Sequence, residues 1–547
     1  MQAYDLLIVG GGINGAAIAR DAAGRGLSVC LVEAGDPAGA TSGASSKLIH
    51  GGLRYLEQYA FGLVRESLRE RAILLKIAPH LTRPCRFVLP LSKGLRPAWM
   101  MQLGLWLYDN LGGTLSASKA LPDATRIRLD DGSDWAAPLK PGFKEGFLYF
   151  DVQVDDARLV ILTLRDAEAR GADILTGTRF LGASRQQAGT DSLWQCRLQQ
   201  GDAIQTTTAR AIVNAAGPWV SQVLDTLCEA RAQPHPGVQL VRGSHIVVPR
   251  CYAGEHAYTL QNEDGRVVFL LPFLDRWTLI GTTDVRTELP EESPQASLEE
   301  IAYLCRAASL YLQRPVTEDQ IVWTFAGLRP LYDDGKRNPS AVTRDYHLIL
   351  KQGQQDDAPL LSVFGGKLTT HRHLAETVMD RLAPWFPHLG ERWTSEVPLP
   401  GGNSDGNDFC AATAEFFQAF AHLPAAMVQG LWGRHGTLAF ELLENIHNAT
   451  DLGEDFGAGL SELEAMHFIR HEWAHRADDI LWRRTKTGLM MSAEQRARFS
   501  EWFSQHGRKQ AQDSANFLTQ TSSARTVGLA PRSSFYPSPF TGEGLNQ

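Results

Sequence analysis

A short polar segment, residues 45–57, combines side chains suited to redox chemistry on a small anion. It holds an imidazole at His50, two consecutive glycines, a guanidinium at Arg54 and a phenol at Tyr55. A histidine titrates in the range useful for proton transfer, and an arginine binds an oxyanion through paired hydrogen bonds. Glycine lets the backbone approach a flat ring closely. We therefore interpret the segment as the place where a cofactor ring meets a substrate.

The residues before this segment have the pattern of a dinucleotide-binding βαβ unit. The apolar residues 6–9 predict a buried parallel strand, and residues 10–15 match G-x-G-x-x-G ahead of an alanine-rich helix. A second strand, residues 28–32, ends at Glu33, near the spacing of the carboxylate that binds a ribose hydroxyl. The helix N-terminus supplies N–H donors to the phosphates. The carboxylate favours FAD or NAD over NADP, and the motif does not choose between the first two.

The composition limits the class of protein. A chain of 547 residues predicts two or three domains. The net charge of −8 argues against a nucleic-acid binder, and it means that an anionic substrate needs a locally basic pocket. Seven scattered cysteines without a CxxC pair predict reduced thiols, and we expect no metal site. Neither a signal peptide nor a membrane-spanning helix is expected, which favours a cytoplasmic location.

The rest of the chain predicts a second sheet and then a helical region. A helix is expected over residues 60–80, and another after Asp155 or Asp156, either of which suits a helix N-cap. Strands are expected at 173–176, 193–199 and 211–217, and the alternating pattern of 239–285 predicts a largely antiparallel sheet. Beyond residue 402 the chain becomes helical, and 519–547 has the composition of a disordered tail.

Residues 94–113 form a short apolar segment rich in Met and Trp. It is either a helix packed on its neighbours, which is the more ordinary reading, or a patch that dips into a membrane surface. Glycine-rich turns also lie close to cations at Arg329 and Lys367. The turn before Lys367 joins a strand to a helix, so its backbone N–H groups could face a ring or a carbonyl oxygen.

These motifs together resemble the FAD-dependent glycerol-3-phosphate dehydrogenases, in particular the bacterial aerobic, respiratory type, over roughly residues 4–505. The segments that carry the resemblance are 10–15, 41–57, 213–219, 243–249, 281–284, 327–331, 365–370, 471–474 and 476–486. The resemblance implies an α/β + α fold of the D-amino-acid-oxidase type. It has a Rossmann-type FAD domain (1–80, 150–235 and 320–390), an antiparallel-sheet substrate domain (81–149 and 236–319) and a helical C-terminal domain (391–518). This sequence departs from the family at His371, where a tyrosine is expected.

The resemblance also implies a reaction and its residues. The reaction is oxidation of sn-glycerol 3-phosphate to dihydroxyacetone phosphate, with electrons passing through FAD to ubiquinone or menaquinone. The enzyme is expected to bind peripherally to the cytoplasmic face of the inner membrane. The expected substrate ligands are Arg54, Tyr55, Arg329 and Lys367, and the expected catalytic residues are His50 as first choice of base, His245 as the second, Arg329 and Lys367. The expected cofactor ligands are Gly10, Gly12, Asn14, Gly15, Glu33, Ser42, Ser45, Ser46, Gly51, Gly217, Trp219, Gly327, Gly366, Lys367, Leu368 and Thr369.

Other functions remain open at this level. A glycerol-3-phosphate oxidase would have the same pocket and would reduce oxygen to peroxide. A flavin-containing binding or RNA-modification protein is disfavoured by the acidic balance, and a flavoprotein with a degenerate site is disfavoured by the set His50, Arg54, Arg329 and Lys367. The sequence does not fix the oligomeric state, for which a homodimer is one option.

Overall fold

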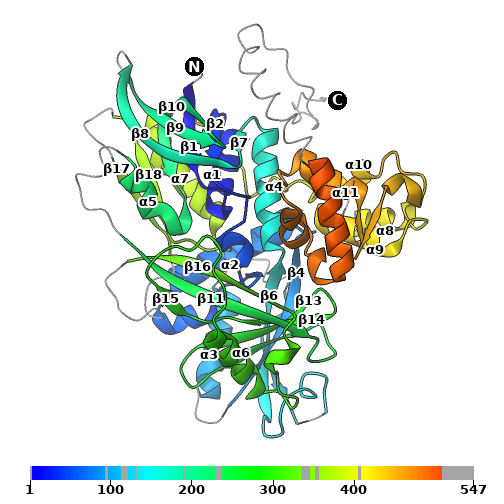
Figure 1. The fold of residues 1–547 in the computed structure, drawn as a ribbon. Coiled ribbons are helices and arrows are strands. Elements are labelled where there is room, and N and C mark those ends of the chain that lie inside the picture. Colours follow the sequence, from blue (N-terminus) through cyan, green and yellow to red (C-terminus); the bar gives the residue numbers. More distant parts are fainter. Residues whose placement is uncertain are drawn as a thin grey trace, which may run out of the picture.

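The structure is a computed structural model that describes residues 3–92, 97–111, 121–130, 132–188, 191–227, 237–333, 345–351, 357–403 and 408–507. Two sheets lie one above the other in Figure 1, and a helical region packs against one side of them. The tail predicted for 519–547 lies outside the described residues.

The upper sheet is built around a parallel core. Its order is β17-β18-β10-β1-β2-β7, with β8 and β9 extending from β10. β1, β2, β7, β10 and β18 run parallel, whereas β17, β8 and β9 pair antiparallel. The bounds are β1 Ala3–Val9, β2 Val29–Val32, β7 Asp173–Leu175, β8 Thr178–Ala188, β9 Asp191–Gln200, β10 Ala203–Asn214, β17 His347–Lys351 and β18 Leu360–Phe364.

Both faces of this sheet are covered, which explains the uninterrupted apolar run of β1. Leu6 and Ile8 pack with the helices α1 (Ile13–Gly24), α4 (Asp156–Ala169) and α7 (His371–Leu382). Leu7 and Val9 face the opposite side, toward β8, β9 and the short helix α5 (Val220–Asp225). Because successive strand residues point to opposite faces, a doubly covered strand needs apolar residues at every position.

The lower sheet has the order β15-β11-β14-β13-β12-β4-β6-β3, with β16 on β11 and β5 on β6. Its pairs are antiparallel except for β12 with β4. The bounds are β3 Leu48–Ile49, β4 Thr82–Pro90, β5 Thr125–Arg128, β6 Glu145–Val154, β11 Val238–Pro249, β12 Ala257–Gln261, β13 Val267–Phe273, β14 Trp277–Gly281, β15 Val285–Thr287 and β16 Trp323–Tyr332.

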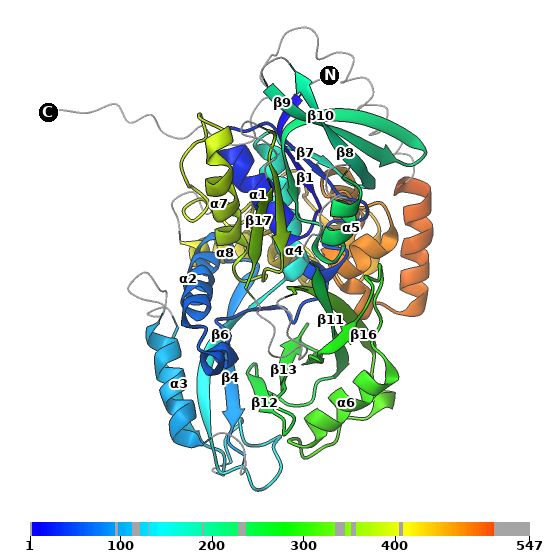
Figure 2. The same ribbon diagram turned by 90° about the vertical axis from the view of Figure 1, so that its left-hand side faces the viewer.

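Two helices pack on opposite faces of this lower sheet. On β4, Val88 faces the core under α6 (Leu298–Ser309), whereas Phe87 and Leu89 face α3 (Ala98–Asn110). α6 begins with a capping box between Ser297 and Glu300. The longer helix α2 (Phe61–Ile77) follows the polar segment of residues 45–57. Figure 2 shows α2 and α3 one below the other along one side of the molecule.

Helix α3 settles part of the question about the apolar segment. Met101, Leu105 and Tyr108 are buried, but the opposite side exposes Trp99 (68%), Leu103 (50%) and Trp106 (59%). The helix therefore packs on its neighbours and also presents an apolar face. None of the described helices combines the length and the apolar composition needed to cross a bilayer.

The C-terminal region consists mainly of helices, as the sequence predicts. α8 (Phe409–Ala419), α9 (Ala425–His435) and α10 (Leu438–Leu442) enclose one core, and α11 (Glu462–His471) with a helix over 493–507 encloses another. A small hairpin, β19 (Asp455–Gly457) and β20 (Leu460–Ser461), joins them. A one-turn π-helix, η9 (Asp479–Arg484), reaches toward the two sheets.

One predicted boundary needs correction. Residues from 320 onward were assigned to the FAD domain, but β16 belongs to the lower sheet, where ten of its residues pair with β11 from Val238 to Val247. β3 likewise pairs with β6 in the lower sheet, although both of its residues fall in the predicted FAD segment 1–80. Both segments therefore belong to the lower sheet, since the pairing partners of a strand are set by long-range contacts that periodicity does not encode.

Candidate functional site

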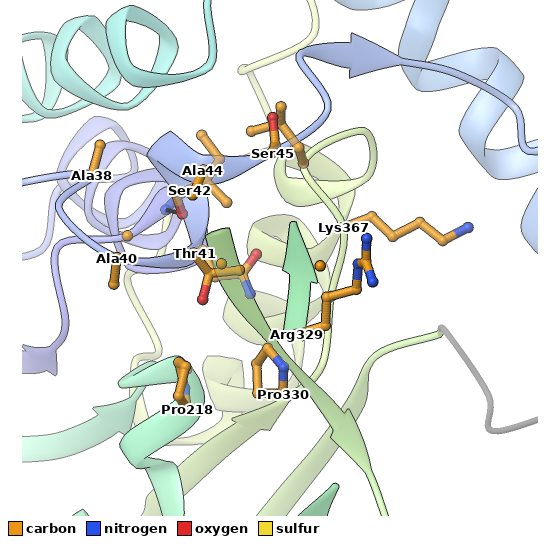
Figure 3. Close-up of a pocket in the computed structure, with 18 of the residues that line it drawn as sticks. Ala38, Ala40, Thr41, Ser42, Ala44, Ser45, Pro218, Arg329, Pro330 and Lys367 are labelled. Atoms are coloured by element: carbon orange, nitrogen blue, oxygen red, sulfur yellow. Dashed lines mark hydrogen bonds between the residues drawn. The ribbon is translucent and has the colours of Figure 1, made fainter. Parts of the chain in front are cut away.

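A cavity of about 1000 Å³ lies where the two sheets meet. Its walls come from the ends of β1, β2 and β10, from the loop that leads into η1 (Thr41–Ala44), and from β11, β16 and the turn before α7. Figure 3 shows Ser42, Arg329 and Lys367 around one part of this space. The predicted residues that line it are Gly10, Gly12, Asn14, Glu33, Ser42, Ser45, Ser46, His50, Tyr55, Gly217, Trp219, His245, Gly327, Arg329, Gly366, Lys367, Leu368 and Thr369.

The nucleotide end of the cavity follows from the glycine motif. Gly10 has φ +112°, and a Cβ there would lie 2.6 Å from the carbonyl oxygen of Ala215. Gly15 does not line the cavity, because it lies where α1 crosses Gly10 so closely that any side chain would overlap the Gly10 carbonyl. The tight turn brings the N-terminus of α1 to the cavity, where its free N–H groups and dipole favour phosphate.

The Glu33 carboxylate closes this end. It accepts hydrogen bonds from the N–H groups of Gly11 (2.6 Å) and Gly35 (2.8 Å). Burial raises the pKa of Glu33, and the two N–H donors oppose that shift. Ser42 Oγ accepts from the Ile13 N–H at 3.0 Å in the first turn of α1. The side chains at the end of β2 are thus held by backbone groups in the arrangement that a bound dinucleotide requires.

The loop after η1 is anchored to α4. Asp155 is the N-cap of α4, and its carboxylate accepts from the Arg158 N–H at 3.1 Å. Asp156 instead accepts from Ser45 Oγ (2.7 Å) and forms a buried ion pair with Lys47 Nζ (2.8 Å). Ser45 is therefore bonded to α4 while it lines the cavity. Lys47 does not line the cavity.

The other end of the cavity gathers the cationic and aromatic groups. Lys367 Nζ lies 3.8 Å from the centroid of the Tyr55 ring. Gly366, with φ +98°, brings the backbone against Asn14, whose Nδ2 donates to the Gly365 carbonyl at 3.2 Å. This contact joins the turn before α7 to the first turn of α1. In Figure 3 the Lys367 side chain extends away from Ala38, Ala40 and Ser42.

Arg329 comes from β16 and is held in a fixed orientation. Its Nη1 donates to Asp284 Oδ1 (2.7 Å) and to the Thr283 carbonyl (3.1 Å), and its Nη2 donates to Thr282 Oγ1 (3.0 Å). Arg329 lies opposite Val241 on β11, and its side chain passes over Gly243 two residues further on, where any side chain would overlap the guanidinium. The guanidinium is thus preorganised at the cavity wall, 24% exposed, for an anion.

The two candidate bases occupy different environments. His50 is half-buried. Its backbone N–H donates to Thr369 Oγ1 (3.3 Å), and its ring contacts the Phe269 ring edge-on, with 6.3 Å between the ring centroids. His245 is only 2% exposed, stacks on Phe325 at 4.7 Å, and shares a 2.9 Å hydrogen bond with Ser46 Oγ. Burial, with the charges of Arg329 and Lys47, holds the pKa of His245 well below its usual range, so this imidazole is neutral near pH 7.

Some residues near the glycine-rich segments do not line the cavity. Gly51 lies behind the wall, where its N–H donates to Tyr108 Oη (2.7 Å). Arg372 does not line the cavity either, because it is buried in an ion pair with Glu70 (2.6 Å). The side chain of Arg54 lies outside the described residues.

His371 begins α7 in a buried position. It does not line the cavity, and its Nδ1 lies 2.7 Å from the Leu368 carbonyl. Burial lowers the pKa of His371 to about 4.

We expected no metal site from the sequence, but the structure contains a group of side chains whose atoms could bind a metal ion. Atoms of His435, His467 and Glu472 lie within 4.8 Å of one another in the described part of the chain. However, the Glu472 carboxylate is already paired with the buried guanidinium of Arg158, which donates to it from both terminal nitrogens. We therefore describe the group as part of the ion-pair network that joins α4 to the C-terminal helices.

Sequence reasoning did not single out two sets of residues that line the cavity. Asp284 and Thr282 orient Arg329, but they were noted only within a segment matching a family. The C-terminal residues Arg476, Asp479 and Arg483 also line the cavity, although they are more than 430 residues from the glycine motif. No local pattern connects either set to the site, because the connection exists only in the folded chain.

Comparison with known proteins agrees with this geometry. Residues 5–372 match the family described as FAD dependent oxidoreductase, and 392–502 match the C-terminal domain of alpha-glycerophosphate oxidase. The chain is 47% identical to a glycerol-3-phosphate dehydrogenase of Pseudomonas aeruginosa (92% of this chain, 95% of that protein) and 46% identical to the aerobic enzyme of Escherichia coli (92% and 97%).

The chain belongs to the FAD-dependent glycerol-3-phosphate dehydrogenase family. Its structure is similar to that of a Bacillus halodurans glycerol-3-phosphate dehydrogenase complexed with FAD, with a TM-score of 0.70, 25% identity and coverage of 93% and 95% of the two chains. The fold is accordingly of the FAD-dependent oxidoreductase type with a helical C-terminal domain, and the cofactor is FAD.

The described residues fit this cofactor. The glycine turn at the start of α1 and the Glu33 carboxylate form a nucleotide-binding end, and the cavity continues without interruption to Lys367 and His50. A dinucleotide needs such an elongated space, with phosphate donors in the middle and an acceptor for the ribose at one end. When bound, FAD supplies the hydride acceptor for oxidation of an alcohol.

Proposed function

We propose that this protein oxidises sn-glycerol 3-phosphate to dihydroxyacetone phosphate and passes the electrons to a membrane quinone. The observation that carries the proposal is the pairing of two cationic side chains, Arg329 and Lys367, on the wall of a cavity that also holds the nucleotide motif. A phosphate dianion is bound best by charge-assisted hydrogen bonds from such groups.

Each residue has a defined part in this proposal. Arg329 binds the phosphate, and Tyr55 and Arg54 add donors from η2 (Leu53–Gln58). Lys367 places its charge between substrate and cofactor, where it favours the reduced, anionic state of the ring system. The backbone turn at Gly366 and Leu368 and the Thr369 hydroxyl complete the wall on the cofactor side.

His50 is proposed as the base that takes the hydroxyl proton. The half-buried position of its ring and its place on the cavity wall support this role. His245 is the second candidate. Its neutral state suits a base, but its Nε2 is already engaged with Ser46 Oγ, and both flank the wall near Arg329. In that position His245 would orient Ser46 rather than receive the proton.

Peripheral attachment to the cytoplasmic face of the inner membrane is the finer part of the proposal. It is supported by the apolar face of α3, where Trp99, Leu103 and Trp106 are exposed together. Two further exposed aromatics, Tyr59 (81%) and Phe61 (40%), lie at the start of α2. Tryptophan and leucine on one helix face insert at the level of lipid headgroups, which would bring a membrane quinone to the enzyme.

One assay tests the proposed reaction and its acceptor. The purified holoenzyme is supplied with sn-glycerol 3-phosphate and either a ubiquinone analogue under argon or oxygen alone, and peroxide is measured in parallel. We expect rapid reduction of the quinone analogue and little peroxide. Stoichiometric peroxide at the full turnover rate would instead identify an oxidase.

The substrate requires a second comparison. A D-erythritol 1-phosphate dehydrogenase of Brucella abortus is 44% identical to this chain, nearly as similar as the glycerol-3-phosphate enzymes. We expect kcat/KM to be higher for sn-glycerol 3-phosphate than for D-erythritol 1-phosphate. The opposite order would move the proposal to the four-carbon substrate without changing the role of Arg329.

A further inference from the structure

The C-terminal domain reaches the cofactor cavity directly. Arg476, Asp479 and Arg483 line it together with Gly35 and Asp36, which follow β2. Asp36 lies three residues after Glu33, the carboxylate at the position that binds the ribose of a dinucleotide. These arginines therefore lie beside the adenosine half of the cavity.

A buried ion pair fixes this contact. Arg484, with a fully buried side chain, donates from Nη1 to Asp36 Oδ2 and from Nη2 to Asp36 Oδ1, both at 2.7 Å. Arg483 pairs with the same carboxylate and also with Asp479. Such two-pronged pairing sets orientation as well as distance. The loop after β2 therefore takes its position partly from a segment about 450 residues away.

The same segment also reaches the loop at the other end of the cofactor site. Lys486 is buried and pairs with Asp155, the N-cap of α4. The neighbouring Asp156 holds Lys47 and Ser45, as described above. Only two residues lie between Arg483, which pairs with Asp36 in the loop after β2, and Lys486, which pairs with the N-cap of α4.

We propose that residues 476–486 form part of the FAD site, with Arg476 and Arg483 as ligands of the adenosine half, and that FAD binding and docking of the C-terminal domain stabilise each other. Arg476 is exposed, and its guanidinium forms no ion pair with an acid among the described residues, so it is available to a ligand. Whatever free energy docking adds to FAD binding must return as FAD stabilising the docked domain. The proposal depends on FAD as cofactor and not on which alcohol is oxidised.

The binding arm of the test uses Arg476→Ala in the full-length protein, with Arg470→Ala as a matched control. Arg470 is an exposed arginine of the same domain that does not line the cavity. After removal of flavin, FAD is titrated back and its Kd is measured by quenching of flavin fluorescence. We expect the Kd to rise at least fivefold for Arg476→Ala and to stay within twofold for Arg470→Ala. Equal Kd values in both variants would overturn the assignment of Arg476.

The coupling arm compares hydrogen exchange of the wild-type apoprotein and holoenzyme. Peptides that cover 476–486 should exchange at least fivefold faster without FAD, whereas the core of α8 and α9, distant from the cavity walls, should be unaffected. Unchanged exchange of 476–486 on addition of FAD would refute the coupling. Lys486→Met, which keeps the length of the side chain, should release FAD at a lower temperature. Because these readouts are binding and exchange, they remain informative if the enzyme proves to prefer another substrate.

Discussion

Removal of the Arg329 guanidinium is the most direct test of the phosphate pocket. Charge-assisted hydrogen bonds contribute about 1.5–3 kcal/mol each. Two of the nitrogens already serve Asp284, Thr282 and Thr283, and the side chain is 24% exposed, so solvent and the Asp284 charge weaken its field. We therefore expect Arg329→Ala to cost about 2 kcal/mol, which is roughly a 30-fold fall in kcat/KM. Arg329→Lys keeps the positive charge but loses the paired N–H donors of the guanidinium, and should lower kcat/KM less than Arg329→Ala does.

The assay measures kcat/KM for sn-glycerol 3-phosphate together with inhibition by inorganic phosphate. Both should weaken by a similar factor if the lost contact is to the phosphate, while the Kd for FAD should change little. Arg250→Ala is the matched control, since Arg250 pairs with Glu255 on the same sheet and does not line the cavity. A fall of less than twofold in Arg329→Ala, or a fall that leaves phosphate inhibition intact, would refute the pocket assignment.

Three further outcomes are expected. His50→Asn should lower kcat and remove the acid limb from the pH profile of kcat/KM; retention of that limb would transfer the base to another group. Replacing Trp99, Leu103 and Trp106 by serine should abolish sedimentation with vesicles of anionic phospholipid while leaving turnover of a soluble quinone analogue unchanged, and undiminished sedimentation would exclude α3 as the anchor.

The pKa of Glu464 is lowered to about 2 by Arg434 and His435 against the effect of burial, so its contribution to stability is complete above its ordinary pKa of 4.5 and is lost as pH falls toward 2. In Glu464→Gln the free energy of unfolding should depend less steeply on pH over that range. A slope equal to that of the wild-type protein would contradict the lowered pKa.

The sequence predicts those parts of the site whose signals are local. The strand, glycine turn, helix and Glu33 lie within some 30 consecutive residues, and their spacing is set by the geometry of one βαβ unit. The pairing of Arg372 with Glu70 lies beyond such reasoning, because 302 residues separate the partners. Glycines precede both arginines in the sequence, but Arg372 lies in α7 and pairs with a buried acid, whereas Arg329 lies within β16 and lines the cavity.

The same limit explains the misplaced domain boundary. The family resemblance implied that the FAD domain includes residues 320–390, and β16 lies within that range. Its register with β11 places it in the lower sheet. Family resemblance supplied what local pattern could not, namely that the turns near Arg329 and Lys367 belong to one pocket.

The origin of the two cations has a thermodynamic consequence. Arg329 extends from β16 of the lower sheet, whereas Lys367 extends from the turn after β18 of the upper sheet. The two sheets also share an apolar core, in which Leu6 of β1 packs with Val152 and Val154 of β6. An anion that contacts both cations adds to this contact between the sheets. By mass action such a ligand stabilises the joined arrangement by RT ln(1 + [L]/Kd). Substrate at a hundred times its Kd would add about 2.7 kcal/mol, and a roughly 30-fold weaker Kd in Arg329→Ala should reduce this gain to about 0.9 kcal/mol at the same concentration.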